Sequence, residues 1–133
     1  MMSPLYSKRR GFTLVEIMVV VAIIALLASL AIPNYVRMRK RTQSMRILTD
    51  LKLIDEAIDQ YALASKKTAG TPVQWGDIQP YIKANSHLYS SGGVDLLGNS
   101  FQGFAVDSTP LLAPESFEAL SDVAPADFWA PYK

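Results

Sequence analysis

One carboxylate near the start of a long apolar segment offers the most distinctive chemistry in this chain. In the stretch Lys8–Glu16, three cations, a glycine and a phenylalanine precede the acid, and three uncharged residues separate the phenylalanine from it. The apolar run Phe12–Ile32 has Glu16 as its only ionisable side chain. A carboxylate at the centre of a bilayer costs about 2.5 kcal/mol or more. We therefore expect Glu16 to be paired with a cation when this segment is buried.

The rest of the chain offers few groups for catalysis. It has one histidine, His87, and no cysteine. Thiolate metal sites, a cysteine nucleophile and disulfides are therefore excluded. A Ser-His-Asp arrangement would have to use His87, which lies in a polar, turn-like stretch. We expect a protein that is not an enzyme and that needs no cofactor.

Four acids in the C-terminal part are candidates for one cation site. Asp107, Glu115, Asp122 and Asp127 lie in a loop-rich region, and carboxylate oxygens are ligands that calcium prefers. Their spacing matches no EF-hand. The alternative, which we favour, is a solvated acidic face.

A membrane-length helix must position Glu16. Residues 12–32 would span about 31 Å as a helix, which matches the roughly 30 Å hydrocarbon thickness of a bilayer. Pro33 follows and predicts a kink, because the pattern beyond it is helical again. Apolar residues recur there at helical spacing: Ile47, Leu51, Ile54, Ile58 and Tyr61. We expect one long helix whose second half is amphipathic.

Short elements follow the helix. Helices are expected in Trp75–Ala84 and Glu115–Val123, and the alternation in Phe101–Val106 predicts a strand paired with His87–Tyr89. The predicted fold is α+β, with the long N-terminal helix packed on a small antiparallel sheet with short helices and loops. The aromatic tail is expected to pack back on this domain. The expected segments are a cationic leader (1–11), a transmembrane helix (12–33), an amphipathic continuation (34–65) and a small α+β domain (66–133).

Charge is segregated along the chain although the net charge is only +1. Three cations precede the apolar run and five follow it, whereas the residues beyond 65 carry a net charge of −3. This pattern suits anionic lipid headgroups better than nucleic acid. By the positive-inside rule alone, the C-terminal domain would be cytoplasmic.

The second half of the helix carries two bands of opposite charge. Cations lie between Arg37 and Arg46, and acids lie between Asp50 and Asp59. The band centres are about 14 residues apart, or about 22 Å in a helix. Parallel copies staggered by this distance would pair one band with the other. Attraction of the basic band to lipid headgroups is the alternative reading.

The segment Arg10–Glu16, with its apolar continuation to Pro33, resembles the processing signature of type IV pilins and type II secretion pseudopilins. The resemblance covers about residues 8–33. It implies that a prepilin peptidase cuts between Gly11 and Phe12, that Phe12 is then N-methylated, and that Glu16 is the assembly carboxylate. It also implies a helix kink at Pro33. The segment Gly92–Asn99 loosely resembles the Asp-Pro-Trp-Gly-Asn segment of major pseudopilins, with two leucines in place of Pro-Trp.

The resemblance implies a structural filament subunit, with the pseudopilus of type II secretion favoured over a type IV pilus. Implied partners are further copies or other pilin-like subunits, the peptidase, an inner-membrane assembly platform and lipid; no nucleic acid is expected. The chain would cross the inner membrane once, with its C-terminal domain in the periplasm. This overrides the charge rule. A signal-anchored envelope protein that binds a ligand without polymerising is the alternative from another class.

Overall fold

The computed structural model describes residues 11–133. Of the expected leader, residues 1–11, all but Gly11 lie outside the described residues. The chain divides into two compact units, Met1–Val36 and Arg37–Lys133. The division falls just beyond the end of the apolar run.

One long helix, α1 (Leu14–Ser65), contributes to both units. It includes Pro33, so the proline does not end the helix; the kink expected there stays a prediction. At its C-terminus Lys66 adopts a left-handed φ of +50°, and the N–H of Lys67 donates to the carbonyl oxygen of Ala62 at 3.1 Å. This bond closes the last turn in the manner of a Schellman motif.

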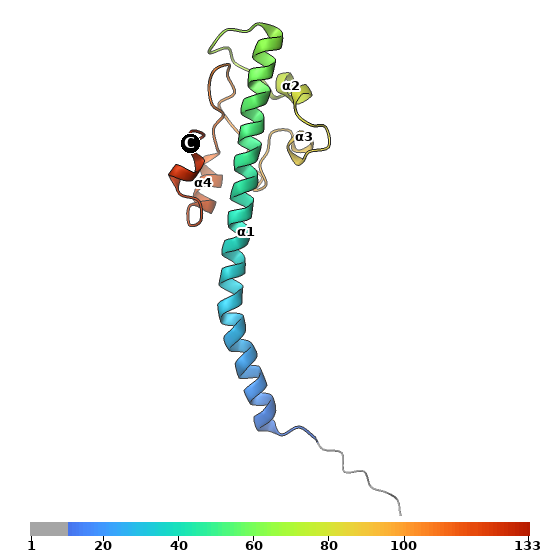
Figure 1. Ribbon diagram of the computed structural model, residues 1–133, viewed down its shortest axis with the longest axis vertical. Coiled ribbons are helices and arrows are strands. Elements are labelled where there is room, and N and C mark those ends of the chain that lie inside the picture. Colours follow the sequence, from blue (N-terminus) through green and yellow to red (C-terminus); the bar gives the residue numbers. More distant parts are fainter. Residues whose placement is uncertain (1–10) are drawn as a thin grey trace, which may run out of the picture. The chain divides into compact units, whose positions relative to one another are not determined.

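The core of the second unit forms against one face of α1. The predicted stripe is confirmed, since Ile47, Leu51, Ile54 and Ile58 are at most 1% exposed and Tyr61 is partly buried. Figure 1 shows α2 (Trp75–Ile78) and α3 (His87–Ser91) on one side of this part of α1, and α4 (Pro114–Leu120) on the other. Side chains from the short helices and from the loops between them complete one apolar cluster with α1: Ile78, Leu88, Phe101, Val106, Leu120 and Trp129.

The expected antiparallel sheet is wrong for the part of the chain that the structure describes. Residues 11–133 contain no strand, and three isolated bridges stand in its place: Pro72 with Ala105, Val94 with Ser100, and Gln102 with Leu111. The predicted fold class, α+β, is therefore replaced by helices joined by bridged loops.

Two local features explain the missing strands. The hydroxyl of Ser86 accepts a hydrogen bond from the N–H of Tyr89 at 3.1 Å, and this N-cap starts α3 where a strand was expected. In the other expected strand, Gly103 has a φ of +74°, which interrupts the extended backbone after Gln102. Neither segment can therefore extend a ladder.

The expected short helices and the packed tail are largely confirmed. The expected helix Trp75–Ala84 appears as α2, followed by the 3₁₀ turn η1 (Gln79–Tyr81) that contains the proline. α4 occupies most of the second expected helix. In the tail, α5 (Ala126–Trp129) buries Trp129 completely, and its indole N–H donates to the carbonyl oxygen of Ala124 at 3.0 Å.

Candidate functional site

The N-terminus of α1 is closed by a pair of reciprocal hydrogen bonds. The N–H of Thr13 donates to Oε2 of Glu16 at 3.2 Å, and the N–H of Glu16 donates to Oγ1 of Thr13 at 3.3 Å. This is a capping box, which satisfies two backbone donors that a helix start would otherwise leave free. Thr13 was not among the expected site residues, although Thr-x-x-Glu before an apolar run is the spacing that signals such a cap.

The capped carboxylate keeps room for a second partner. A carboxylate has about four lone-pair sites on its two oxygens, and the cap uses one of them on Oε2. Both Thr13 and Glu16 are exposed. Glu16 can therefore hold its own helix start and still accept from a cationic donor.

The two residues before the cap are exposed. Phe12 is 84% exposed, and a Cβ built at Gly11 would meet no atom within 4 Å. Packing within the described residues therefore does not require a glycine at position 11.

The first half of α1 presents apolar side chains on all sides. Its most apolar window has a mean hydropathy of 2.8, and none of that window is buried within the chain. A helix that is apolar all round is stable only when lipid or protein covers it. By length and composition, α1 is also the one helix among residues 11–133 that can cross a membrane.

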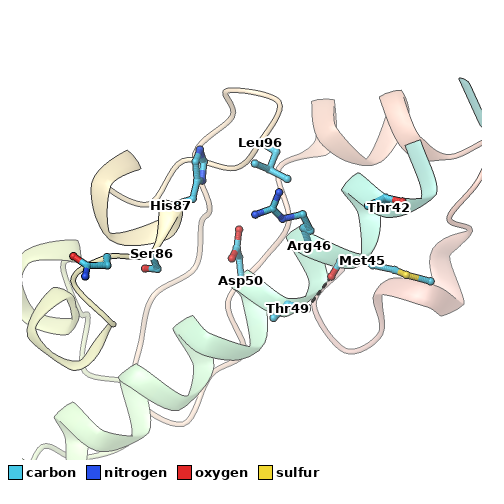
Figure 2. A pocket seen from close by; sticks show the side chains of 9 residues that line it. Thr42, Met45, Arg46, Thr49, Asp50, Ser86, His87 and Leu96 are labelled. Atoms are coloured by element: carbon cyan, nitrogen blue, oxygen red, sulfur yellow. Dashed lines mark hydrogen bonds between the residues drawn. The ribbon is translucent and has the colours of Figure 1, made fainter. Parts of the chain in front are cut away.

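A polar pocket of about 450 Å³ lies beside the second half of α1. Figure 2 shows Arg46 and Asp50 extending from adjacent turns of α1 toward the segment that carries Ser86 and His87. Burial raises the pKa of Asp50; His87 and Arg46 oppose this shift and Asp95 adds to it.

The pocket gathers a serine, a histidine and an aspartate without forming a catalytic triad. The Ser86 hydroxyl donates to the carbonyl oxygen of Lys83 at 2.7 Å and accepts from the N–H of Tyr89. It therefore acts as a helix cap. A nucleophilic serine would instead hydrogen-bond to the imidazole that activates it.

A buried carboxylate organises the loop that resembles the pseudopilin segment. Asp95 is 3% exposed, and its Oδ1 accepts from the N–H groups of Leu97 and Asn99 at 2.8 and 3.0 Å. Its Oδ2 accepts from the hydroxyl of Ser116 on α4, and that hydroxyl also accepts from the side-chain amide of Asn99 at 2.8 Å. The aspartate and asparagine of the motif therefore join the loop to α4. The role of Ser116 was not foreseen.

The four acids considered for calcium are not brought into one group. Among residues 11–133, no cluster of three or more His, Cys, Asp or Glu side chains has a metal-binding arrangement. Asp122 instead pairs with Lys40, whose Nζ lies 3.0 Å from Oδ2, and this hydrogen bond lowers the pKa of Asp122. Asp107 lines a separate pocket with Asp59 and Lys67. Glu115 begins α4 and Asp127 lies in α5.

Comparison with known proteins points to the N-terminal segment. A family model described as the prokaryotic N-terminal methylation motif matches residues 6–32. The type II secretion system core protein G of Klebsiella pneumoniae is 33% identical over 89 residues, which cover 65% of this chain and 64% of that protein. The core protein G of Escherichia coli (strain K12) is 43% identical over 57 residues, 43% of this chain and 39% of that protein.

A pilus protein matches as well. The type IV major fimbrial protein FimA of Dichelobacter nodosus is 39% identical over 69 residues, which are 52% of this chain and 43% of FimA. These matches support membership of the pilin and pseudopilin family. Pilins and pseudopilins are structural proteins, not enzymes. The match spans less than two thirds of the length of each of these relatives, and no solved structure matches the chain.

Within this family the apolar half of α1 fits an inner-membrane anchor. The family motif contains Gly11, Phe12, Thr13 and Glu16, and it ends one residue before Pro33. The capping box therefore lies inside the segment that the family shares. The Asp95 network lies outside the motif.

Proposed function

We propose that the chain is a precursor that a prepilin peptidase cuts between Gly11 and Phe12, and that the new N-terminus at Phe12 is N-methylated. The mature chain then polymerises into a helical filament, the pseudopilus of a type II secretion system. The methylation motif at residues 6–32 and the relatives named core protein G support this proposal.

The observation that carries the proposal is a single carboxylate at the first turn of α1, whose first half is exposed and otherwise uncharged. Cleavage before Phe12 creates an amine four residues from Glu16. Removal of the subunit from the bilayer exchanges lipid contacts for helix contacts with other copies. Leaving either charge unpaired in that apolar interior would be costly. Glu16 of one copy therefore pairs with the Phe12 amine of an adjacent copy.

The waiting subunit is held in the inner membrane by the first half of α1, with residues 37–133 in the periplasm. This orientation leaves the leader on the cytoplasmic side, where the peptidase acts. An inner-membrane assembly platform then extracts the subunit, which polymerises with further copies or with other pilin-like subunits.

A type IV pilus subunit is the second candidate. It is favoured by the similarity to FimA and by a 47% identity over 47 residues to the type IV major pilin protein PilA of Myxococcus xanthus. Fibres sheared from the cell surface would contain this chain if it forms a pilus. They would lack it if it forms a periplasmic pseudopilus.

Mass spectrometry of the native protein tests the processing step. We expect a chain that begins at Phe12 and carries the mass of one extra methyl group. A chain that still begins at Met1 or Met2 would contradict the proposal.

Replacement of the acid tests the assembly step. Glu16→Leu should be inserted and cut normally but should yield no filaments, whereas Glu118→Leu, which changes an exposed acid on α4, should assemble as the wild type does. Normal polymerisation of Glu16→Leu would contradict the proposed pairing of Glu16 with the Phe12 amine.

A further inference from the structure

The second half of α1 exposes an uncharged stripe on the face that is turned away from its own core. Three of the six large hydrophobic side chains exposed in residues 37–133 lie on it: Met38 (58% exposed), Met45 (49%) and Leu53 (39%). Thr42 and Thr49 fill the intervening turns. These five residues, spaced by three or four positions, form one helix face about 22 Å long, which we call the α1 stripe.

The polar atoms of the α1 stripe are already satisfied. The hydroxyl of Thr42 donates to the carbonyl oxygen of Met38 at 3.0 Å, and the hydroxyl of Thr49 donates to that of Met45 at 2.9 Å. Figure 2 draws the second of these bonds. A partner that covers the stripe therefore leaves neither hydroxyl without an acceptor. The two threonines can then form part of an apolar contact surface.

Cations border the α1 stripe on both sides. Arg39 and Arg46 lie on one flank and Arg41 and Lys52 on the other, and all four are exposed. Within residues 11–133 the one ion pair is Lys40 with Asp122, so none of these four cations forms an ion pair there. An apolar strip between exposed cations fits a partner that offers apolar contact and carboxylates together.

The end of α1 supplies such carboxylates. Glu56 and Asp59 are exposed and fall on the helix face that carries the stripe. The centre of Arg39, Arg41 and Arg46 lies about 16 residues, or about 23 Å, before these two acids. The other two acids in the second half of the helix, Asp50 and Asp55, are only partly exposed, and Asp55 accepts a hydrogen bond from the Tyr132 hydroxyl.

We propose that the α1 stripe is an interface between copies of this chain. The Glu56–Asp59 end of one α1 lies against Arg39, Arg41 and Arg46 of a second α1, which is parallel to it and shifted by about 23 Å. The inference rests on the proposed filament and concerns a second neighbour of each copy, because the pairing of Glu16 with the Phe12 amine of an adjacent copy shifts two helices by only about 6 Å. Lys40 takes no part, because it holds Asp122 of its own chain.

Cysteine cross-linking in the full-length protein tests this contact directly. The chain has no cysteine, so one copy with Arg41→Cys and another with Asp59→Cys carry the only two thiols. Coexpressed in filament-forming cells and oxidised, they should form a disulfide-linked dimer. Arg41→Cys with Glu118→Cys should not. Absence of the first dimer, or equal yield of the second, would overturn the proposed register.

Charge reversal gives a second test that does not depend on disulfide geometry. Arg39→Glu with Arg41→Glu should lower filament yield by about tenfold, because two attractions become repulsions. The matched control, Lys66→Glu with Lys67→Glu, reverses two cations beyond the end of α1 and should assemble normally. Adding Glu56→Lys with Asp59→Lys to the first variant should restore assembly, and failure of this rescue would contradict the pairing.

The two proposals fail in distinguishable ways. One outcome is that the wild type is processed and forms filaments although the cross-link is absent and charge reversal leaves filament yield unchanged. In that case the α1 stripe is not the interface and the filament proposal stands. If the wild type is unprocessed and forms no filaments, the proposed function fails and the register fails with it.

Discussion

At the scale of single residues, Glu16 has a role within its own chain as well as the role proposed between chains. Its carboxylate caps the first turn of α1 through the N–H of Thr13. A negative charge at a helix N-terminus is also favoured by the helix dipole. The same acid therefore keeps the helix start ordered next to the place where the new amino end would be made.

Removing the Thr13 hydroxyl should loosen this start. Thr13→Val keeps the size and branching of the side chain but loses the bond to the N–H of Glu16, at a cost of about 1 kcal/mol to the first turn. Hydrogen exchange of the first-turn amides in detergent micelles should be faster by about fivefold. Thr13→Ser, which keeps the hydroxyl, should exchange like the wild type, and equal protection in both variants would contradict the cap.

The raised pKa of Asp50 predicts how the stability of the fold depends on pH. Burial raises its pKa above the ordinary value of 3.8, against the opposing charges of His87 and Arg46. Between 3.8 and the raised pKa the folded chain binds more protons than the unfolded chain. The free energy of unfolding therefore falls as pH rises through that window and stays lower above it.

The Asp50→Asn variant lacks this carboxylate. It should be more stable than the wild type at neutral pH, and its advantage should disappear in acid below the window. Thermal unfolding of the full chain in micelles over a pH series measures both effects. Glu118→Gln, at an exposed site, should show no such change. A variant that is equally or less stable at neutral pH would contradict the prediction.

At the scale of elements, helical periodicity predicted α1 and its buried face correctly, because a long stripe of apolar residues repeats the same signal over many turns. The short segments gave too few residues for this. His87–Tyr89 reads equally well as strand or helix, and the Ser86 cap decides for helix. A β-ladder also needs a second segment as its partner. Gln102 pairs with Leu111, and the alternation of residues around Gln102 does not identify that partner.

The site was predictable to a similar extent. The local motif at Gly11, Phe12 and Glu16 could be found from sequence, because its chemistry depends on adjacent residues. The Asp95–Ser116 bond and the Lys40–Asp122 pair join residues 21 and 82 positions apart. Such contacts are set by tertiary packing and leave no local signal.

The Asp95 network is expected to hold the loop and α4 together as one element. Asp95→Ala leaves two backbone N–H groups and the Ser116 hydroxyl without their acceptor. Each unsatisfied buried donor costs about 1–3 kcal/mol, so urea unfolding should show a loss of about 2 kcal/mol or more. Asp127→Ala, at an exposed position, should change stability by less than about 0.5 kcal/mol. Equal effects would mean that the network does not stabilise the fold.

At the scale of the whole molecule, the two units differ in how their apolar side chains are covered. The first exposes its apolar surface and needs lipid or other copies to cover it. The second contains every residue of the apolar core cluster, from Ile47 to Tyr132. The second unit therefore builds its apolar core from its own residues, which suits the proposed exchange of lipid for protein around the first half of α1.

This division predicts that residues 37–133 fold without the anchor. A fragment of that range retains the buried face of α1 together with all the short elements that pack on it. It should dissolve without detergent and unfold in one cooperative thermal transition. A shorter fragment, residues 54–133, lacks Ile47 and Leu51, both fully buried; losing two such side chains removes about 4–6 kcal/mol, at about 2–3 kcal/mol each. Because small domains are stable by only about 5–15 kcal/mol, we expect the shorter fragment to show no transition. If the longer fragment also fails to unfold cooperatively, the membrane half of α1 must contribute to folding as well as to anchoring.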